Sequence, residues 1–174
     1  MASLHFVIGG ARSGKSAFAE QLALSRAGNG MATYIATAEI FDDDMGGRVA
    51  LHQERRGSQW QLVESPVDLA AAVKSADAPD AVLLIDCLSV WITNILVKEM
   101  DVDRAQASLV SALHSASGTV IMVASETGLG IIPENALSRR FRDANGRLCQ
   151  AAASCADEVF FVVAGIASKI KPQA

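Results

Sequence analysis

Short apolar segments alternate with longer segments of helical periodicity along the 174 residues, and this alternation predicts an α/β fold with a mostly parallel sheet. A glycine-rich segment separates the first apolar segment from the first helical one, which indicates a turn at the end of the first strand. We therefore expect one domain over residues 1–174, with helices on both faces of a central sheet.

The expected strands are short apolar runs bounded by glycine, proline or polar residues. They cover residues 4–8, 32–36, 61–63, 82–85, 120–124 and 159–163. We expect the last of these runs to be the last strand of the sheet.

The expected helices have apolar residues at helical spacing and recognisable ends. They cover residues 16–27, 45–56, 67–75, 88–100, 103–117 and 133–156. Gly28 and Gly30 indicate the end of the first helix. Ser65 and Pro66 are suited to the N-cap and the first position of the third helix, and Pro133 to the start of the last one.

The composition excludes several classes of protein. Hydrophobic residues make up 51% of the chain and charged residues 20%, which excludes a disordered chain. The net charge of -4 and the pI of about 5.3 disfavour a broad basic face for nucleic acid. The longest apolar run, residues 159–167, is about half of the ~20 residues that span a bilayer. Three cysteines without C-x-x-C spacing, and a start that does not read as a leader, favour a cytoplasmic protein.

Residues 9–16 match the pattern G-x-x-x-x-G-K-S/T, in which backbone N–H groups curl around phosphate oxygens. They are Gly9, Gly10, Ala11, Arg12, Ser13, Gly14, Lys15 and Ser16. Lys15 would reach the β- and γ-phosphates of a nucleotide and Ser16 would bind Mg²⁺. The alternative is an accidental match in a glycine-rich turn, which the strand before it and the helix after it disfavour. The motif and the alternation together predict a P-loop NTPase fold of the RecA-like type.

Asp86 follows the apolar run 82–85 and supplies the acidic strand end that a P-loop protein uses to hold Mg²⁺. The alternative is a helix cap for the segment that starts near Leu88. Capping and metal binding are compatible, and we favour the metal or nucleotide role.

Residues 48–56 contain a histidine in a basic stripe. On a helix, Arg48, His52 and Arg55 or Arg56 share one face. Three cationic groups around one imidazole are unfavourable unless an anion lies among them, and they disfavour protonation of the ring. A neutral imidazole can attack phosphorus and hold a nucleotidyl group covalently. The alternative is a solvated helix face with a surface histidine, and the stripe alone favours neither interpretation.

Several further short motifs accompany the phosphate loop. They are residues 34–38 (YIATA), 43–52 (D-x-M-x-x-R-V-x-x-H), 86–88 (DCL), 126–133 (E-x-G-x-G-I-I-P), 141–143 (FRD) and 156–159 (ADEV), with Trp60, Glu64, Thr93 and Asn94. With residues 9–16, this set resembles the adenosylcobinamide kinase / adenosylcobinamide-phosphate guanylyltransferase family over nearly the whole chain.

The resemblance implies a bifunctional enzyme of cobalamin nucleotide-loop assembly. Such an enzyme phosphorylates the aminopropanol hydroxyl of adenosylcobinamide with ATP or GTP. It then transfers GMP from GTP to that phosphate, which yields adenosylcobinamide-GDP and pyrophosphate. In the family the GMP is carried by a histidine within R-I/V-x-x-H, and the matching residue here is His52. The resemblance also suggests a homo-oligomer, a trimer with sites near subunit interfaces.

The resemblance implies further nucleotide contacts. The matching residues are Thr37, Ala38, Glu39, Gln53, Glu54, Arg55, Arg56, Glu64 and Asp86. For Glu64 the alternative is a surface residue at a strand end. Ser125 and Cys149 depart from the family pattern, which usually has asparagine at both positions. Serine can still hydrogen-bond, whereas Cys149 loses the amide. If these positions contact the corrinoid, its affinity or selectivity changes while catalysis at His52 does not.

Two alternative functions stay open on the sequence. The first is a simple P-loop kinase of small molecules, in which His52 only contacts phosphate. The second is a RecA-like ATPase that binds nucleic acid, which the acidic pI and the 5% aromatic content disfavour. In the bifunctional interpretation both reactions use Lys15 and only the second needs His52. The sequence identifies neither the base for the substrate hydroxyl nor a preference between ATP and GTP in the kinase step.

Overall fold

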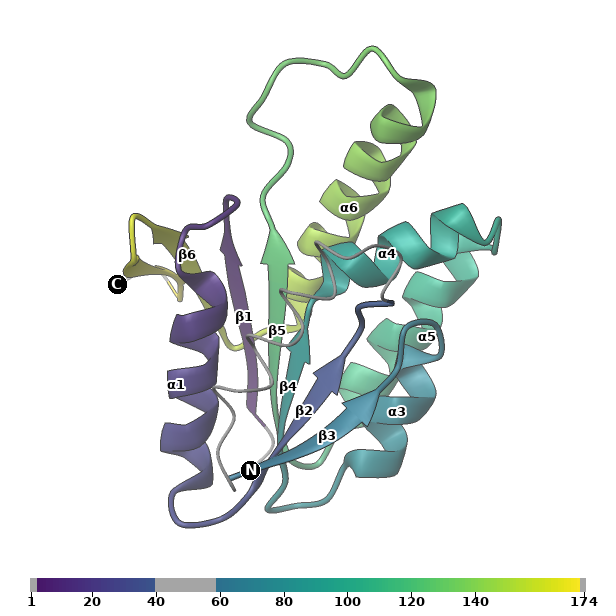
Figure 1. Ribbon diagram of the computed structural model, residues 1–174. Helices are drawn as coiled ribbons and strands as arrows, with labels where there is room; N and C mark the ends of the chain where they lie inside the picture. The colour runs from purple at the N-terminus through teal and green to yellow at the C-terminus, as the bar shows by residue number, and fades with distance from the viewer. Residues whose placement is uncertain (1–2, 40–58, 173–174) are drawn as a thin grey trace.

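The computed structural model describes residues 3–39 and 59–172 (Figure 1). The strands are β1 (Ser3–Gly9), β2 (Ala32–Ala36), β3 (Trp60–Glu64), β4 (Val82–Asp86), β5 (Thr119–Ser125), β6 (Glu158–Val163) and β7 (Ile166–Lys171). The helices are α1 (Lys15–Ala27), α3 (Leu69–Ala76), α4 (Leu88–Val97), α5 (Val102–Ser115) and α6 (Ala136–Cys155). The helix expected over residues 45–56 lies outside the described residues.

The strands form a seven-stranded sheet in the order β3-β2-β4-β5-β1-β6-β7. Neighbouring strands pair in parallel, except β6 and β7, which are antiparallel. This confirms the predicted α/β fold with a mostly parallel sheet. Because the carboxyl ends of β1, β4 and β5 lie at the same edge, the segments that follow these strands meet there, where open α/β sheets bind their ligands.

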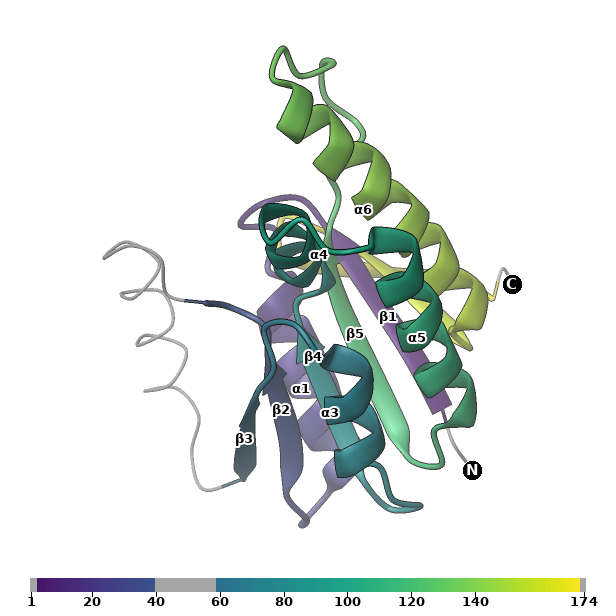
Figure 2. The same ribbon diagram turned by 90° about the vertical axis from the view of Figure 1, so that its right-hand side faces the viewer.

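Helices cover both faces of the sheet, as the sequence predicted. Helix α1 lies on one face, and α3, α4, α5 and α6 lie on the other (Figures 1 and 2). On the single-helix face, Ala19 and Ala23 are fully buried, and their small side chains let α1 approach the sheet closely. On the other face, Trp91 and Leu109 are among the large side chains of a wider apolar core.

Two predicted helix starts are wrong because other side chains provide the caps. Helix α3 begins at Leu69, and the Asp68 carboxylate accepts a hydrogen bond from the N–H of Ala71 at 3.2 Å. Helix α6 begins after Asn135, whose side chain accepts hydrogen bonds from two N–H groups of the first turn. Pro133 therefore precedes the helix, as do Ser65 and Pro66 at α3.

Helix α4 also ends earlier than predicted, at Val97 instead of residue 100. Glu99 has a φ of 54°, and this left-handed conformation does not continue a helix.

The expectation that residues 159–163 end the sheet is also wrong, because β7 follows as an antiparallel partner of β6. Ala164 and Gly165 connect the two strands with φ angles of 52° and 79°, as in a type I′ hairpin turn. The N–H of Gly165 donates to the carbonyl of Ser13 at 2.8 Å. The hairpin turn therefore packs directly against the segment that follows β1.

Candidate functional site

The segment after β1 has the backbone geometry of a phosphate-binding loop. Gly14 has a φ of 94° and is the N-cap of α1, and no side chain of the described residues caps that helix. The first N–H groups of α1 are therefore available to an anion. A Cβ on Gly9 would overlap the carbonyl oxygen of Val162 and lie 2.6 Å from Ser13 Oγ. Glycine is thus required at both positions, one for conformation and one for space.

Two polar side chains of this loop are positioned to bind phosphate. Lys15 Nζ donates to the carbonyl of Gly10 at 3.2 Å, which holds the ammonium group over the loop. Ser13 Oγ is buried and has no hydrogen-bond partner among the described residues. A buried hydroxyl without a partner is costly, so its position in the loop favours a bound acceptor.

Asp86 ends β4, and its Oδ2 accepts a hydrogen bond from the Tyr34 hydroxyl at 2.8 Å. The N-cap of α4 is Cys87, with no side-chain cap, so the alternative of Asp86 as a helix cap is wrong. The peptide bond between Asp86 and Cys87 is cis. Burial, with a further contribution from the Asp86 charge, raises the pKa of the Cys87 thiol to about 12, so this thiol stays neutral beside the carboxylate.

The other described acidic candidates lie on the β2–β3 side of Asp86. Glu64 ends β3 and is exposed, in a cross-strand row with Ala36 and Asp86. Glu39 forms an ion pair with Lys98 at 3.1 Å. Both stay predictions as nucleotide contacts.

The described contacts give Thr37 a structural role. Its hydroxyl is fully buried, donates to the carbonyl of Cys87 and accepts from the Cys87 N–H, both at 2.8 Å. Asn94 donates to the Thr37 carbonyl at 2.8 Å. The Thr37 N–H also donates to the Asp86 carbonyl at 3.3 Å. These bonds tie the end of β2 to the start of α4 and engage both the side chain and the backbone of Thr37, so the nucleotide contact predicted at Thr37 stays a prediction.

The segment after β5 is held to the phosphate loop and to α6. The N–H of Glu126 donates to the carbonyl of Gly9 at 3.0 Å. Asn145 on α6 is 2% exposed and donates to the Ser125 carbonyl at 2.9 Å and to Thr127 Oγ1 at 3.1 Å. Ser89 on α4 donates to Asn145 Oδ1 and accepts from the Ser125 N–H, both at 2.8 Å. This closed set of bonds fixes the β5 end relative to two helices.

Two cavities adjoin this segment. The first, of about 570 Å³, lies between phosphate-loop residues 10–13, residues 126, 127, 129 and 130, and residues 161–164. The second, of about 460 Å³, lies between the same segment, β1 and α6. Glu126, Thr127 and Leu129 line both cavities. The sequence motif contains these residues, but only the fold shows that they lie opposite the phosphate loop.

The two departures from the family pattern fall in this region. Ser125 takes part in the hydrogen-bonded set around Asn145 through its backbone. Cys149 lines the second cavity, and burial, with a smaller contribution from Glu126, raises the pKa of its thiol to about 12. The amide that position 149 lacks is present one helical turn earlier, at Asn145.

The predicted histidine nucleophile and its neighbours lie outside the described residues. These residues are Arg48, His52, Gln53, Glu54, Arg55 and Arg56. Their roles stay predictions. The described residues bring together the phosphate loop, Asp86 and the Glu126 segment at one edge of the sheet.

The sheet and its phosphate loop define the class of protein as a P-loop NTPase fold. A solved structure supports this: flagellar accessory protein FlaH from Methanocaldococcus jannaschii, with a TM-score of 0.50 and 14% identity. The match covers 96% of this chain and 75% of that chain, and it concerns the fold alone.

The sequence comparisons identify the family. The family model for cobinamide kinase / cobinamide phosphate guanyltransferase, CobU, matches residues 5–170. The bifunctional adenosylcobalamin biosynthesis protein CobP of Pseudomonas aeruginosa is 43% identical over 168 residues, covering 95% of each protein. The corresponding protein CobU of Salmonella typhimurium is 37% identical over 180 residues, covering 95% of this chain and 98% of CobU. The chain belongs to the cobinamide kinase / cobinamide phosphate guanyltransferase family, and it is a kinase and a nucleotidyltransferase.

No helix in the described ranges is both long enough and apolar enough to cross a bilayer.

Proposed function

We propose that this chain phosphorylates adenosylcobinamide with ATP or GTP, and then transfers GMP from GTP to the new phosphate through a covalent intermediate on His52. The products of the second step are adenosylcobinamide-GDP and pyrophosphate. The observation that carries the proposal is a phosphate loop, with a buried Ser13 hydroxyl that lacks a partner among the described residues, in a chain of this family.

In the kinase step, the loop and α1 hold the phosphates of the nucleotide. The N–H groups at the start of α1 contact phosphate oxygens, and Lys15 turns from the Gly10 carbonyl to the β- and γ-phosphates. These groups neutralise charge as the γ-phosphoryl group moves to the substrate hydroxyl.

Mg²⁺ fits the donor set at the same edge. Ser16 lies in the first turn of α1, which packs against β4, and Asp86 ends β4. A hydroxyl and one carboxylate are sufficient, because Mg²⁺ keeps several water ligands and takes few from protein. When bound, Mg²⁺ would offset charge on the phosphate oxygens. Asp86 is oriented for this by the hydrogen bond from Tyr34.

In the guanylyl step, a ring nitrogen of His52 attacks the α-phosphorus of GTP and pyrophosphate leaves. We propose that Arg48, Arg55 and Arg56, which accompany His52 in the basic stripe, stabilise the negative charge of the transition state. A phosphate oxygen of the substrate then displaces the histidine and takes the GMP. The phosphate loop holds the leaving pyrophosphate, so Lys15 serves both steps.

Incubation with α-labelled GTP tests the proposal. We expect a covalent GMP adduct that is labile in acid and stable in base, and that is absent from His52→Ala. His114→Ala is the matched control and should keep the adduct, because His114 lies on α5 against Cys155. Transfer of γ-label to adenosylcobinamide without any protein adduct would instead support a simple P-loop kinase.

The proposal includes a homo-oligomer. Large apolar side chains are exposed on the β6–β7 hairpin and on the segment between β5 and α6. They are Val163, Ile166, Ile170, Leu129, Ile131 and Ile132. An exposed apolar surface of this kind favours association. Light scattering on the purified chain measures the oligomeric state, and a monomer at micromolar concentration would contradict this part.

A further inference from the structure

Glu126 lies beside the phosphate loop, and its carboxylate has no role in the two steps proposed above. It follows β5 directly, and β5 lies between β4 and β1 in the sheet. It lines the cavity that phosphate-loop residues 10–13 form with the β6–β7 hairpin. Among the described residues that line this cavity, it is the one carboxylate. A group bound in this cavity would meet the phosphate loop on one side and Glu126 on another.

The position of Glu126 is fixed by its backbone and by one of its two carboxylate oxygens. Its N–H donates to the Gly9 carbonyl at 3.0 Å, which joins it to the start of the phosphate loop. Its Oε1 accepts a hydrogen bond from the N–H of Gly128. No described residue donates to Oε2. The flanking residues Ser125 and Thr127 are held by Asn145, so the carboxylate is oriented before any substrate arrives.

Three other carboxylates in the described part of this edge have different surroundings. Asp86 accepts from Tyr34 and lies on β4. Glu39 is paired with Lys98, and Glu64 is exposed on the edge strand β3. None of these three lines either cavity beside the Glu126 segment. A proton acceptor for a hydroxyl bound against the phosphate loop is therefore best supplied by Glu126.

We infer that Glu126 is a catalytic residue of the kinase step, in which its Oε2 binds the substrate hydroxyl and takes its proton. This inference rests on the proposed function. The O–H bond breaks and the proton passes to Oε2, while the hydroxyl oxygen forms a bond to the γ-phosphorus. The bond from the γ-phosphorus to the bridging oxygen breaks, and its electron pair leaves with the nucleoside diphosphate.

The guanylyl step does not need Glu126 as a base. Its nucleophiles are a neutral imidazole nitrogen and a phosphate oxygen that is already ionised, so no hydroxyl proton has to be removed. A base role therefore predicts that Glu126 matters for one reaction and is dispensable for the other.

The decisive variant is Glu126→Gln, which keeps the shape of the side chain and the Oε1 acceptor for Gly128 but cannot take a proton. Three reactions are measured separately: γ-label transfer to adenosylcobinamide, α-label transfer to the protein, and GMP transfer to supplied adenosylcobinamide phosphate. We expect kcat of the first reaction to fall about 10²–10⁴-fold, and the other two to stay within about threefold. The KM for the nucleotide in the first reaction should also stay within about threefold.

The matched control is Glu134→Gln, an exposed carboxylate of the same segment that lines neither cavity. It should leave all three rates unchanged. Glu126→Asp retains a carboxylate and should recover part of the kinase rate.

Two outcomes would overturn the inference. One is a kinase rate of Glu126→Gln within about threefold of the parent chain. The other is an equal loss of all three reactions, which would indicate a structural role. Failure of the proposed function is distinguishable, because the parent chain itself would then lack the GMP adduct or the kinase reaction.

Discussion

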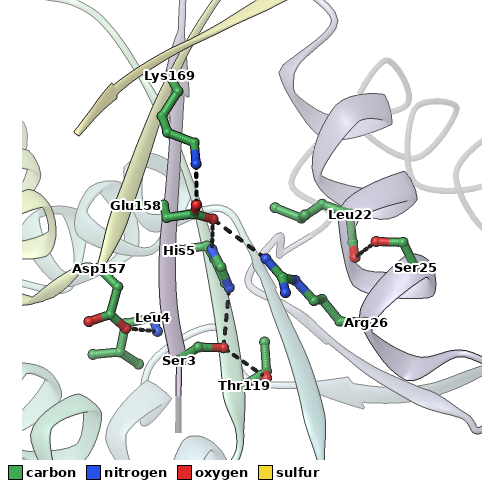
Figure 3. Close-up of polar contacts among 10 residues, drawn as sticks. All are labelled: Ser3, Leu4, His5, Leu22, Ser25, Arg26, Thr119, Asp157, Glu158 and Lys169. Carbon is green, nitrogen blue, oxygen red and sulfur yellow. Dashed lines mark hydrogen bonds and ion pairs between the residues drawn. The ribbon is translucent and has the colours of Figure 1, made fainter. Parts of the chain in front are cut away.

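The two ends of the sheet differ in whether their charged and polar groups have partners within the chain. At the amino end, Glu158 lies at the centre of a compact cluster (Figure 3). His5 Nδ1 lies 3.0 Å from one Glu158 oxygen and Arg26 Nη2 lies 3.5 Å from it, while Lys169 pairs with the other. Ser3 Oγ lies 3.2 Å from His5 Nε2, and it also bonds to Thr119. Nearly every group there has a partner within the fold.

At the carboxyl end of the strands, several polar and charged groups are instead positioned to bind a ligand. Ser13 Oγ is buried without a described partner, Lys15 bonds to a backbone carbonyl, and Glu126 lines a cavity beside the phosphate loop. A cluster of charged groups by itself therefore does not mark a site. A stronger indication is a set of polar and charged groups with unused hydrogen-bonding capacity beside a cavity.

The largest effect is expected from Lys15→Ala. Removal of the ammonium group from the phosphate loop should lower both the kinase and the guanylyl rates by about 10³-fold, because both steps develop charge on phosphates held there. Lys74→Ala, at an exposed position on α3, is the control. If Lys15→Ala spared one of the two reactions, the idea of a single shared loop would be wrong.

A second large effect is expected from Asn145→Ala. The substitution leaves the Ser125 carbonyl and the Ser89 hydroxyl with unmet hydrogen bonds, which should lower the free energy of unfolding by about 1–3 kcal/mol. Urea unfolding measures this, and the kinase kcat should fall as well because the Glu126 segment loosens. Ser154→Ala on the exposed side of α6 should change neither. A variant of unchanged stability with reduced kcat would show that the hydrogen bonds of Asn145 position the Glu126 segment without stabilising the fold.

A smaller effect is expected from Gly128→Ala. A Cβ at this position would lie 3.0 Å from Glu126 Oε1, so the carboxylate has to shift. We expect the kinase rate to fall about tenfold with little change in guanylyl transfer. Gly130→Ala adds a methyl group to the lining of the same cavity but meets nothing within 4 Å, so it separates a shift of Glu126 from the effect of added bulk. Equal kinase rates in the two variants would show that the kinase step does not depend on the exact position of the Glu126 carboxylate.

The smallest effect is expected at the amino end, as a change in the pH dependence of stability. Burial, with a further contribution from Arg26, holds the pKa of His5 below its ordinary value of 6.5, although Glu158 and Asp157 oppose this. The folded state therefore resists protonation, and stability that is present above pH 6.5 is lost as the pH falls through the lowered pKa. Urea unfolding at about pH 7.5 and about pH 5.5 should show this loss.

His5→Gln should show a smaller loss of stability over the same pH range, and His114→Gln should behave like the parent chain. Glu158 contributes at lower pH, because the hydrogen bond from Lys169 chiefly holds its pKa below the ordinary value of 4.5. Its stabilising contribution is lost only as the pH falls through that lowered pKa. An unchanged pH profile in His5→Gln would show that the cluster does not couple folding to protonation.

Local sequence patterns predicted most of the sheet. The apolar runs at β1, β2, β4 and β5 were identified to within about two residues, because a buried parallel strand is a nearly continuous apolar run. Strand β7 was missed: its exposed residues alternate weakly, and its pairing depends on the Ala164–Gly165 turn. The start of α3 was misplaced because Asp68 competes with Ser65 as the cap, and only the folded chain decides between them.

The phosphate loop, the acidic end of β4 and the family can be identified from the amino-acid sequence, because these signals are contiguous or sit at fixed spacing. The folded chain is needed to see that Tyr34 orients Asp86, that Thr37 is buried against α4, and that Glu126 lines a cavity with the phosphate loop. The physical reason is separation along the chain. Tyr34 and Asp86 are 52 residues apart and meet because β2 and β4 pair in parallel. Asn145 lies 20 residues after Ser125 and reaches it because α6 packs on the sheet beside α4.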